Sequence, residues 1–126
     1  MIRQKSKQPI SKIQRQIWQE CRRIADKLYK NDCYTCGSKN LQGSNKQLGH
    51  LYSKATLSAY LKYDMRVLRW QCFRCNINGG GCGADYYARM LKEKGKAFMD
   101  QLEKDRQITV KAYDFYVDLL EKYKKL

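Results

Sequence analysis

The chain has 126 residues, of which 43% are hydrophobic, and its mean hydropathy is negative. This length allows one domain with a modest core and excludes two independent domains. No stretch approaches the roughly 20 apolar residues of a membrane span, which excludes an integral membrane protein. The basic N-terminus has neither the apolar block nor the cleavage site of a secretory signal, so we expect a cytoplasmic protein. Paired cysteines in that reducing compartment indicate metal binding and not disulfides.

The formal charge of +14 at pH 7 indicates a polyanionic partner, because Lys and Arg side chains that neutralise phosphates release condensed counterions. The charge is uneven along the chain. Residues 1–30 contain nine basic and two acidic side chains, and residues 33–76 contain seven and one, whereas residues 77–126 contain ten and eight. We therefore expect nucleic acid to bind the N-terminal two thirds. The alternative is that the basic residues only keep the protein in solution.

The N-terminal part reads as a basic arm over residues 1–9, closed by Pro9, and a helix over about residues 11–30 that Ser11 can cap. Apolar residues recur there at spacings of three and four, which places them on one helix face. They are Ile10, Ile13, Ile17, Cys21, Ile24 and Leu28. Because Cys21 lies within this stripe, we expect a small buried side chain and not a metal ligand.

The middle of the chain predicts little regular structure. Residues 31–50 are rich in Gly, Asn and Ser, which suits a metal-binding knuckle followed by a short hairpin or loop. Residues 66–71 favour an extended segment. The glycine run at 79–81 interrupts any helix that begins near Asn76.

Three helices are expected after the glycine run, over about residues 84–94, 96–106 and 109–125, the last with Thr109 as its cap. The last helix has an apolar stripe. The stripe consists of Val110, Tyr113, Val117 and Leu120, and is widened by Tyr116, Leu119 and Tyr123. This width suggests a second apolar surface, so we expect a homodimer through the C-terminal helices.

Two CxxC pairs, Cys33 with Cys36 and Cys72 with Cys75, predict one zinc site. A two-residue gap lets both sulfurs of a pair reach the same tetrahedral ion. Gly37 suits the tight turn after the first pair. Four thiolates leave no open coordination position, so this zinc would be structural and not catalytic. The alternative is four unrelated free thiols.

His50 and Asn76 are the candidate catalytic residues. His50 is the only histidine and lies between the two cysteine pairs, while Asn76 directly follows Cys75. A neutral imidazole can take a proton from water, and an amide oxygen can bind a divalent cation. The alternatives are a structural histidine and an asparagine that caps a helix.

The order of motifs in the middle of the chain resembles the NinG/Rap recombination nucleases of lambdoid phages, a family of HNH or His-Me finger endonucleases. The motifs are CxxCG, GH, LKYDxR and QCxRCN, followed by a glycine and a tyrosine, and they cover about residues 30–95. The matching positions are Cys33, Cys36, Gly37, Gly49, His50, residues 61–66, residues 71–76, Gly81 and Tyr86.

The resemblance implies an α+β fold that is mostly helical, with a small treble-clef (ββα-metal) zinc core between N-terminal and C-terminal helices. The zinc-bound nuclease core would span residues 31–95, between the arm and helix of residues 1–30 and a helical region of residues 96–126, all in one compact domain. The implied activity is cleavage of branched DNA, such as Holliday junctions or D-loops. His50 would be the general base, and Asn76 would bind a catalytic Mg²⁺ or Mn²⁺.

The chain departs from the family pattern at several positions. Many HNH enzymes have an acidic metal ligand just before the base, whereas this chain has Gly49. We propose Asp64 as the metal ligand in its place, although Asp64 could instead form a salt bridge with Arg66 or Arg69. The other candidate ligands are Asn78 and Asp85. Two further positions differ from the family: Asn78 replaces the histidine of several relatives, and Cys82 replaces an asparagine that is common there. If these changes remove the cation, the protein is a noncatalytic zinc-dependent DNA-binding module.

Basic side chains near these motifs are the expected DNA contacts. They are Arg15, Arg22, Arg23, Lys54, Lys62, Arg66, Arg69 and Arg74. Aromatic residues, Tyr52, Tyr60, Tyr63 and Trp70, interleave with them and could stack on exposed bases. Packing in the core explains the aromatic residues equally well, and we favour it for Trp70.

Overall fold

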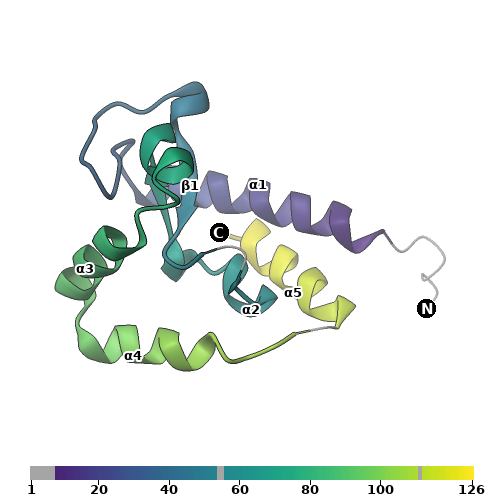
Figure 1. The fold of residues 1–126 in the computed structure, drawn as a ribbon. Helices are drawn as coiled ribbons and strands as arrows, with labels where there is room; N and C mark the ends of the chain where they lie inside the picture. Colours follow the sequence, from purple (N-terminus) through teal and green to yellow (C-terminus); the bar gives the residue numbers. More distant parts are fainter. Residues whose placement is uncertain (1–7, 54–55, 111) are drawn as a thin grey trace, which may run out of the picture.

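The computed structural model of the chain describes residues 8–53, 56–110 and 112–126. Its longer helices and its two strands are α1 (Ile10–Leu28), β1 (Gln47–His50), β2 (Leu68–Gln71), α3 (Gly83–Lys94), α4 (Lys96–Asp105) and α5 (Tyr113–Lys124) (Figure 1). The shorter helical segments are η2 (Gly43–Asn45), α2 (Ala59–Lys62), η4 (Met65–Val67) and η5 (Arg74–Asn78). A mostly helical α+β fold is thus confirmed, and the treble-clef arrangement stays a prediction.

The first helix follows the predicted apolar stripe. Ile13, Ile17, Cys21 and Ile24 are buried, which confirms the expected role of Cys21. The expected cap at Ser11 is wrong, because α1 already begins at Ile10, directly after Pro9. Pro9 is the N-cap residue with an extended backbone, and its ring has no N–H that would need a partner. Only Gln8 and Pro9 of the predicted basic arm lie within the described residues.

The last helix packs along α1 (Figure 1). Its buried side chains are Tyr116, Leu120 and Tyr123. Two cations of α1 bind the C-terminal carbonyls of the chain: Arg23 Nη2 donates to Tyr123 O at 2.9 Å, and Lys27 Nζ donates to Leu126 O at 2.6 Å. Of the residues that widen the stripe, Tyr116 and Tyr123 are therefore buried within the chain itself, whereas Leu119 is half-buried. The helix begins at Tyr113, so the expected cap at Thr109 is wrong.

The two strands form an antiparallel sheet in which Gln47 pairs with Gln71 and His50 pairs with Leu68. Because side chains alternate along a strand, the sheet has two distinct faces. One face turns toward α1, where the guanidinium of Arg22 lies 5.1 Å from the ring centre of Trp70. Trp70 is 1% exposed, which confirms its place in the core. The other face carries Gln47 and Gln71.

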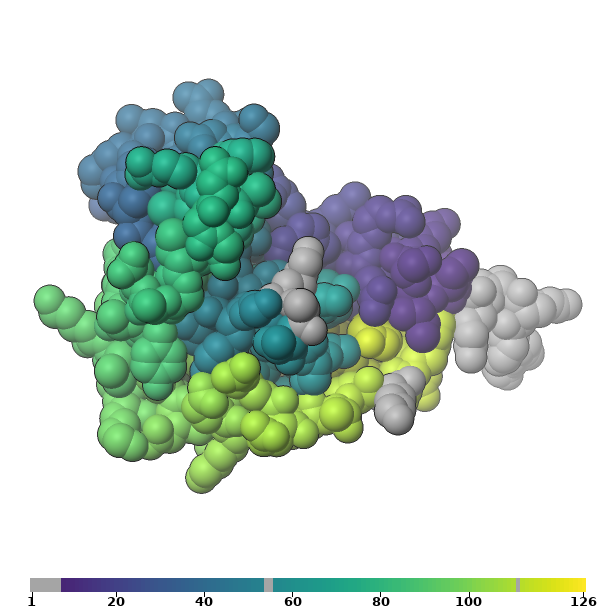
Figure 2. Space-filling model, viewed as in Figure 1, coloured from purple at the N-terminus to yellow at the C-terminus, as the bar shows by residue number. Residues whose placement is uncertain are grey.

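The remaining helices complete one buried cluster with α1, α5 and the sheet. Gly95 joins α3 to α4 with a φ of +90°, a conformation that favours glycine. The loop before β1 lies beside η5 in the upper part of Figure 2, where Phe73 N donates to Asn45 Oδ1 at 2.8 Å. Of the helices in the described ranges, none has the length and apolar composition that crossing a membrane demands.

Candidate functional site

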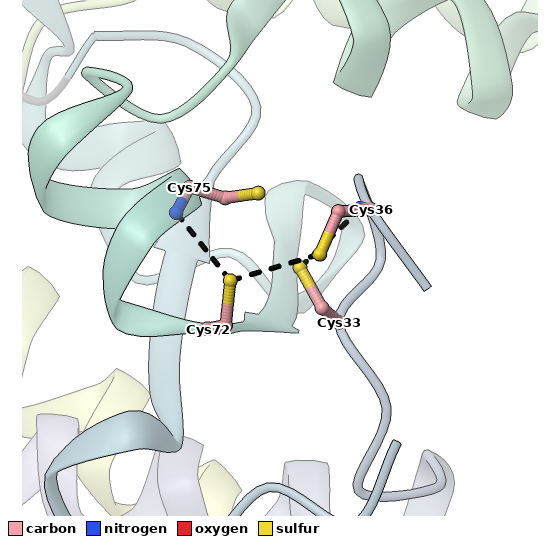
Figure 3. Close-up of side chains that lie close together, drawn as sticks. All are labelled: Cys33, Cys36, Cys72 and Cys75. Atoms are coloured by element: carbon pink, nitrogen blue, oxygen red, sulfur yellow. Dashed lines mark hydrogen bonds between the residues drawn. The ribbon is translucent and has the colours of Figure 1, made fainter. Parts of the chain in front are cut away.

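The four predicted zinc ligands converge in space. Their sulfur atoms all lie within 4.8 Å of one another (Figure 3). The sulfurs of Cys36 and Cys72 are 3.7 Å apart. Four sulfurs bound tetrahedrally to zinc at about 2.3 Å lie about 3.8 Å from each other. The cluster therefore has the size and the chemistry of a Cys₄ zinc site.

Local backbone structure orients each cysteine pair. The N–H groups of Cys36 and Cys75 point at the sulfurs of Cys33 and Cys72, at N···S distances of 3.5 and 3.4 Å. Gly37 closes the first turn with a φ of +81°. The second pair lies where β2 ends and η5 begins, so the zinc would join the loop before β1 to the end of the sheet.

Hydrogen bonds favour the thiolate form of two ligands. Burial raises the pKa of Cys33, but bonds from the Thr35 hydroxyl and from backbone amides outweigh this effect and lower the pKa to about 6. The Ser38 hydroxyl lowers the pKa of Cys36. Thiolates are the metal-binding form of cysteine. The sulfur of Cys82 stands outside the cluster and donates to Cys75 O at 3.6 Å.

His50 lies at the end of β1. Its Nε2 contacts the carbonyl oxygen of Lys62 at 2.8 Å. Because a carbonyl only accepts, the neutral ring carries its proton on Nε2 and its lone pair on Nδ1. The indole of Trp18, from α1, stacks on the imidazole with ring centres 5.5 Å apart. The ring thus has a defined tautomer and a defined plane.

Asn76 lies in η5, one residue after a zinc ligand. Its backbone N–H donates to Cys72 O at 3.0 Å, and its side-chain Nδ2 donates to Gln47 Oε1 at 2.8 Å. Asn76 and His50 line the same pocket of about 380 Å³. His50 also lines a second pocket of about 290 Å³, together with Arg15 and other residues. The two predicted catalytic residues therefore border one cavity, and His50 lies at the junction with another.

Close packing requires a glycine just before His50. A Cβ at Gly49 would lie 1.8 Å from Gln71 Oε1 and 3.0 Å from Asn76 Oδ1. The buried hydroxyl of Tyr86 donates to Gly49 O at 2.9 Å and to Val67 O at 3.1 Å. In the sequence, Gln71 and Tyr86 stand out only as motif positions. The one feature of the sequence that points to their contacts with Gly49 is the glycine itself, directly before the candidate base.

Asp64 is engaged elsewhere. Its carboxylate accepts from the backbone N–H of Arg66 at 2.9 Å and pairs with the Arg66 guanidinium at 2.8 Å. Arg66 also pairs with Asp105 at 2.9 Å. Asp64 lines a different pocket from His50 and Asn76. Of the two readings of Asp64, the structure shows the salt bridge with Arg66.

A family model described as the bacteriophage lambda NinG protein matches residues 2–126, nearly the whole chain. The chain belongs to the NinG family. Searches of the curated proteins and of the solved structures gave no significant match. Membership in this phage family supports a recombination-related role.

Several basic residues of this NinG-family chain lie in the interior or are held by partners. Arg69 is only 5% exposed, donates to Leu68 O at 2.8 Å and lies over the ring of Tyr29. Arg69 therefore supports the fold and does not lie on the surface where we expected it to bind DNA. Arg66 is held by its two carboxylates, and Arg22 is half-buried against the sheet.

Other predicted DNA contacts of the NinG-family chain do face solvent. Arg15 is exposed and lines the pocket with Lys62 and His50. Arg74 is exposed on η5, where the Cys36 thiol group raises its pKa. Arg23 is also exposed but pairs with Glu20. Lys54 lies outside the described residues. The predicted DNA contacts that share a pocket with His50 are thus exposed Arg15 and half-buried Lys62.

Proposed function

We propose that this chain is a metal-dependent endonuclease that cuts branched DNA, with His50 as the general base. The observation that carries the proposal is the setting of His50. Its Nε2 is held by Lys62 O, which leaves the lone pair on Nδ1. It borders the pocket of Asn76 on one side and that of Arg15 on the other.

This setting suits phosphodiester hydrolysis. In that reaction a water oxygen bonds to phosphorus, the proton of the water passes to the base, and the bond from phosphorus to the leaving oxygen breaks. His50 Nδ1 would accept the proton. A bound divalent cation supplies stabilisation of the negative charge on the phosphate and the leaving oxygen. The amide oxygen of Asn76 is a hard ligand that fits Mg²⁺ or Mn²⁺.

DNA is the partner that the charge supports. The net charge of +14 provides non-specific attraction. Arg15 and Lys62 place positive charge beside the base, where the phosphate to be cut would lie. The resemblance to recombination nucleases and the NinG-family match support branched DNA as the substrate. We place this activity in the cytoplasm of the phage-infected bacterium.

A cleavage assay tests the proposal. Zinc-loaded protein is incubated with a labelled four-way junction or a linear duplex of the same sequence, in Mg²⁺ or Mn²⁺. We expect metal-dependent cuts in the junction, which His50→Ala and Asn76→Ala abolish. Asn31→Ala is the matched control, because Asn31 is an exposed asparagine that does not line this pocket and should be dispensable. An intact junction in both metals, or full cleavage by His50→Ala, would refute the proposal.

A second candidate function is a noncatalytic, zinc-dependent DNA-binding module. The observation that favours it is the lining of the pocket that His50 and Asn76 share, which contains no carboxylate among the described residues. Catalytic Mg²⁺ sites usually include one or two carboxylates. This candidate predicts junction binding that survives His50→Ala and requires no divalent metal beyond zinc.

We also propose that two copies act together through their C-terminal helices. A four-way junction has near two-fold symmetry, so paired cuts need two sites. Half-buried Phe115 and Leu119 of α5 line a groove of about 590 Å³ and remain for a second copy. Light scattering at assay concentrations measures the mass, and we expect twice the 14.9 kDa of one chain. A mass of one chain, with or without DNA, would exclude the dimer.

A further inference from the structure

We infer that the side-chain oxygens of Gln71 and Asn76 form a divalent-cation site beside Gly49, in which Gln71 supplies the oxygen ligand that glycine cannot. The role of this ion in cleavage rests on the proposed function, whereas the existence of the site does not. The inference depends on the orientation of two amides and on the position of both oxygens beside Gly49.

The orientation of Gln71 follows from its hydrogen bonds. Its side chain is 0% exposed, and Nε2 donates to Gly81 O at 2.9 Å and to Thr35 Oγ1 at 3.0 Å. A backbone carbonyl only accepts, so the NH₂ group must face Gly81 and the oxygen must face the other way. Within the described ranges, Gln71 Oε1 has no hydrogen-bond donor. A buried amide oxygen without a partner is unfavourable, and it requires an explanation.

The orientation of Asn76 follows by the same logic. Gln47 Nε2 donates to Ser44 O at 2.9 Å, so Gln47 Oε1 is the atom that faces Asn76. That oxygen accepts from Asn76 Nδ2 at 2.8 Å. The oxygen of Asn76 must therefore point away from Gln47, toward Gly49.

Both oxygens lie beside Gly49. The position that a Cβ of Gly49 would take lies 1.8 Å from Gln71 Oε1 and 3.0 Å from Asn76 Oδ1. The pairing of the strands explains why the Gln71 side chain reaches Gly49. Gln71 pairs with Gln47, and Gly49 lies two residues after Gln47 on the same face of the sheet. Two acceptor oxygens that lie close together, with no hydrogen-bond donor in the part of the chain that the structure describes, create a negative potential that suits a cation.

The ligand chemistry selects the kind of ion. Amide oxygens are hard, neutral ligands that bind Mg²⁺, Mn²⁺ or Ca²⁺ and not soft metals. Neutral ligands hold such an ion weakly, so water and a DNA phosphate would complete its coordination. A phosphate that shares this ion would be drawn to the strand end where His50 lies.

Paramagnetic broadening in the zinc-loaded wild-type protein tests the site directly. Mn²⁺ is titrated into ¹⁵N-labelled protein while the side-chain amide signals are observed. We expect the Gln71 and Asn76 NH₂ signals to broaden first, and excess Mg²⁺ to restore them. Broadening centred on exposed carboxylates, with both amide signals unchanged, would overturn the inference.

A charge substitution provides the second test. Gln71→Glu keeps the length of the side chain and adds a charged oxygen, so Mn²⁺ affinity measured by electron paramagnetic resonance should rise on the order of tenfold. The matched control is Gln107→Glu, the same change at an exposed residue after α4, which should leave the affinity unchanged. Equal affinity in both variants, with zinc retained, would show that Gln71 only fills space. If Gln71→Glu does not fold, the broadening experiment decides alone.

The two proposals fail in different ways. Mn²⁺ at Gln71 and Asn76 without junction cleavage would refute the endonuclease and leave the site standing. Cleavage with Mn²⁺ bound elsewhere would refute this site and leave the endonuclease standing.

Discussion

The indole of Trp18 lies nearly parallel to the imidazole of His50, with ring centres 5.5 Å apart and an interplanar angle of 11°. Trp18 belongs to α1, outside the zinc core that surrounds His50 in sequence. The edge of the same indole meets the ring of Tyr63 at 6.4 Å. The first helix thus holds the plane of the candidate base, and we expect Trp18 to act as a positioning residue.

Replacing Trp18 with leucine should therefore lower kcat for junction cleavage on the order of tenfold, with little change in KM, because a misplaced base slows the proton transfer. The NMR signals of the His50 ring should broaden at the same time. Phe98→Leu, which removes a half-buried aromatic ring of α4 that lines neither pocket of His50, is the control and should leave both readouts unchanged. An unchanged kcat in the Trp18 variant would show that the stack only supports the fold.

Gly49→Ala should destabilise the protein by about 1–3 kcal/mol, because the new Cβ would overlap Gln71 Oε1. Urea unfolding of the zinc-loaded protein measures the free energy. Gly83→Ala is the matched control, since a Cβ there meets nothing within 4 Å. The same stability in both variants would mean that the Gln71 side chain moves aside at no cost.

Arg15→Gln should weaken junction binding. The plot of the logarithm of the binding constant against the logarithm of the salt concentration should also become less steep by about 0.9, because one phosphate contact is lost. Arg15 is exposed beside His50. Fluorescence anisotropy across a salt series gives the slope. Lys92→Gln removes a charge from the exposed side of α3 and should leave the slope unchanged. If both changes lower the slope equally, binding follows net charge alone.

Cys72→Ser should abolish zinc binding and the cooperative fold, because three thiolates no longer close the tetrahedral site. Zinc content and far-ultraviolet circular dichroism report the two effects. Cys82→Ser is the control, since this sulfur lies outside the cluster, and it should retain one zinc per chain. Chelating the zinc should likewise unfold the wild-type protein. Loss of zinc from the Cys82 variant would contradict the ligand assignment.

Stability should fall at alkaline pH, and Cys21 should account for part of the loss. Burial raises the pKa of the Cys21 thiol to about 12 in the folded state. Its pKa is about 8.5 in the unfolded chain, which therefore binds fewer protons than the folded chain between these values. The contribution of the protonated Cys21 thiol to the free energy of unfolding is fully present below about pH 8.5. It decreases as pH rises, and about 2 kcal/mol is lost at about pH 10.

The Cys21→Ala variant removes this titration. Its free energy of unfolding should be lower at neutral pH because of the cavity, but should fall less steeply from about pH 8 to about pH 10. Cys82→Ala controls for the loss of a thiol. Parallel curves for wild type and Cys21→Ala would mean that this thiol does not ionise on unfolding in that range.

The zinc set and the stripe of α1 were predictable because both depend on local spacing. Two cysteines separated by two residues can bind the same ion whatever the rest of the fold. Apolar residues at spacings of three and four lie on the same side of any helix. The placement of His50 and Asn76 at one pocket was predictable for a related reason, since His50 ends β1 and Asn76 directly follows a predicted zinc ligand. Their catalytic roles stay a prediction. The first residues of the helices were harder to predict: α1 begins directly after Pro9 and not after Ser11, and α5 begins four residues after Thr109.

Only the tertiary structure decided which basic and polar residues lie beside the candidate site. Arg15 and Arg69 look alike in sequence, yet one faces solvent beside His50 and the other is buried over Tyr29. Side chains distant in sequence determine these outcomes, as Trp18 does for His50 and Gln71 for Gly49. Spacing carries no information about such contacts, because they depend on how the helices pack against the sheet.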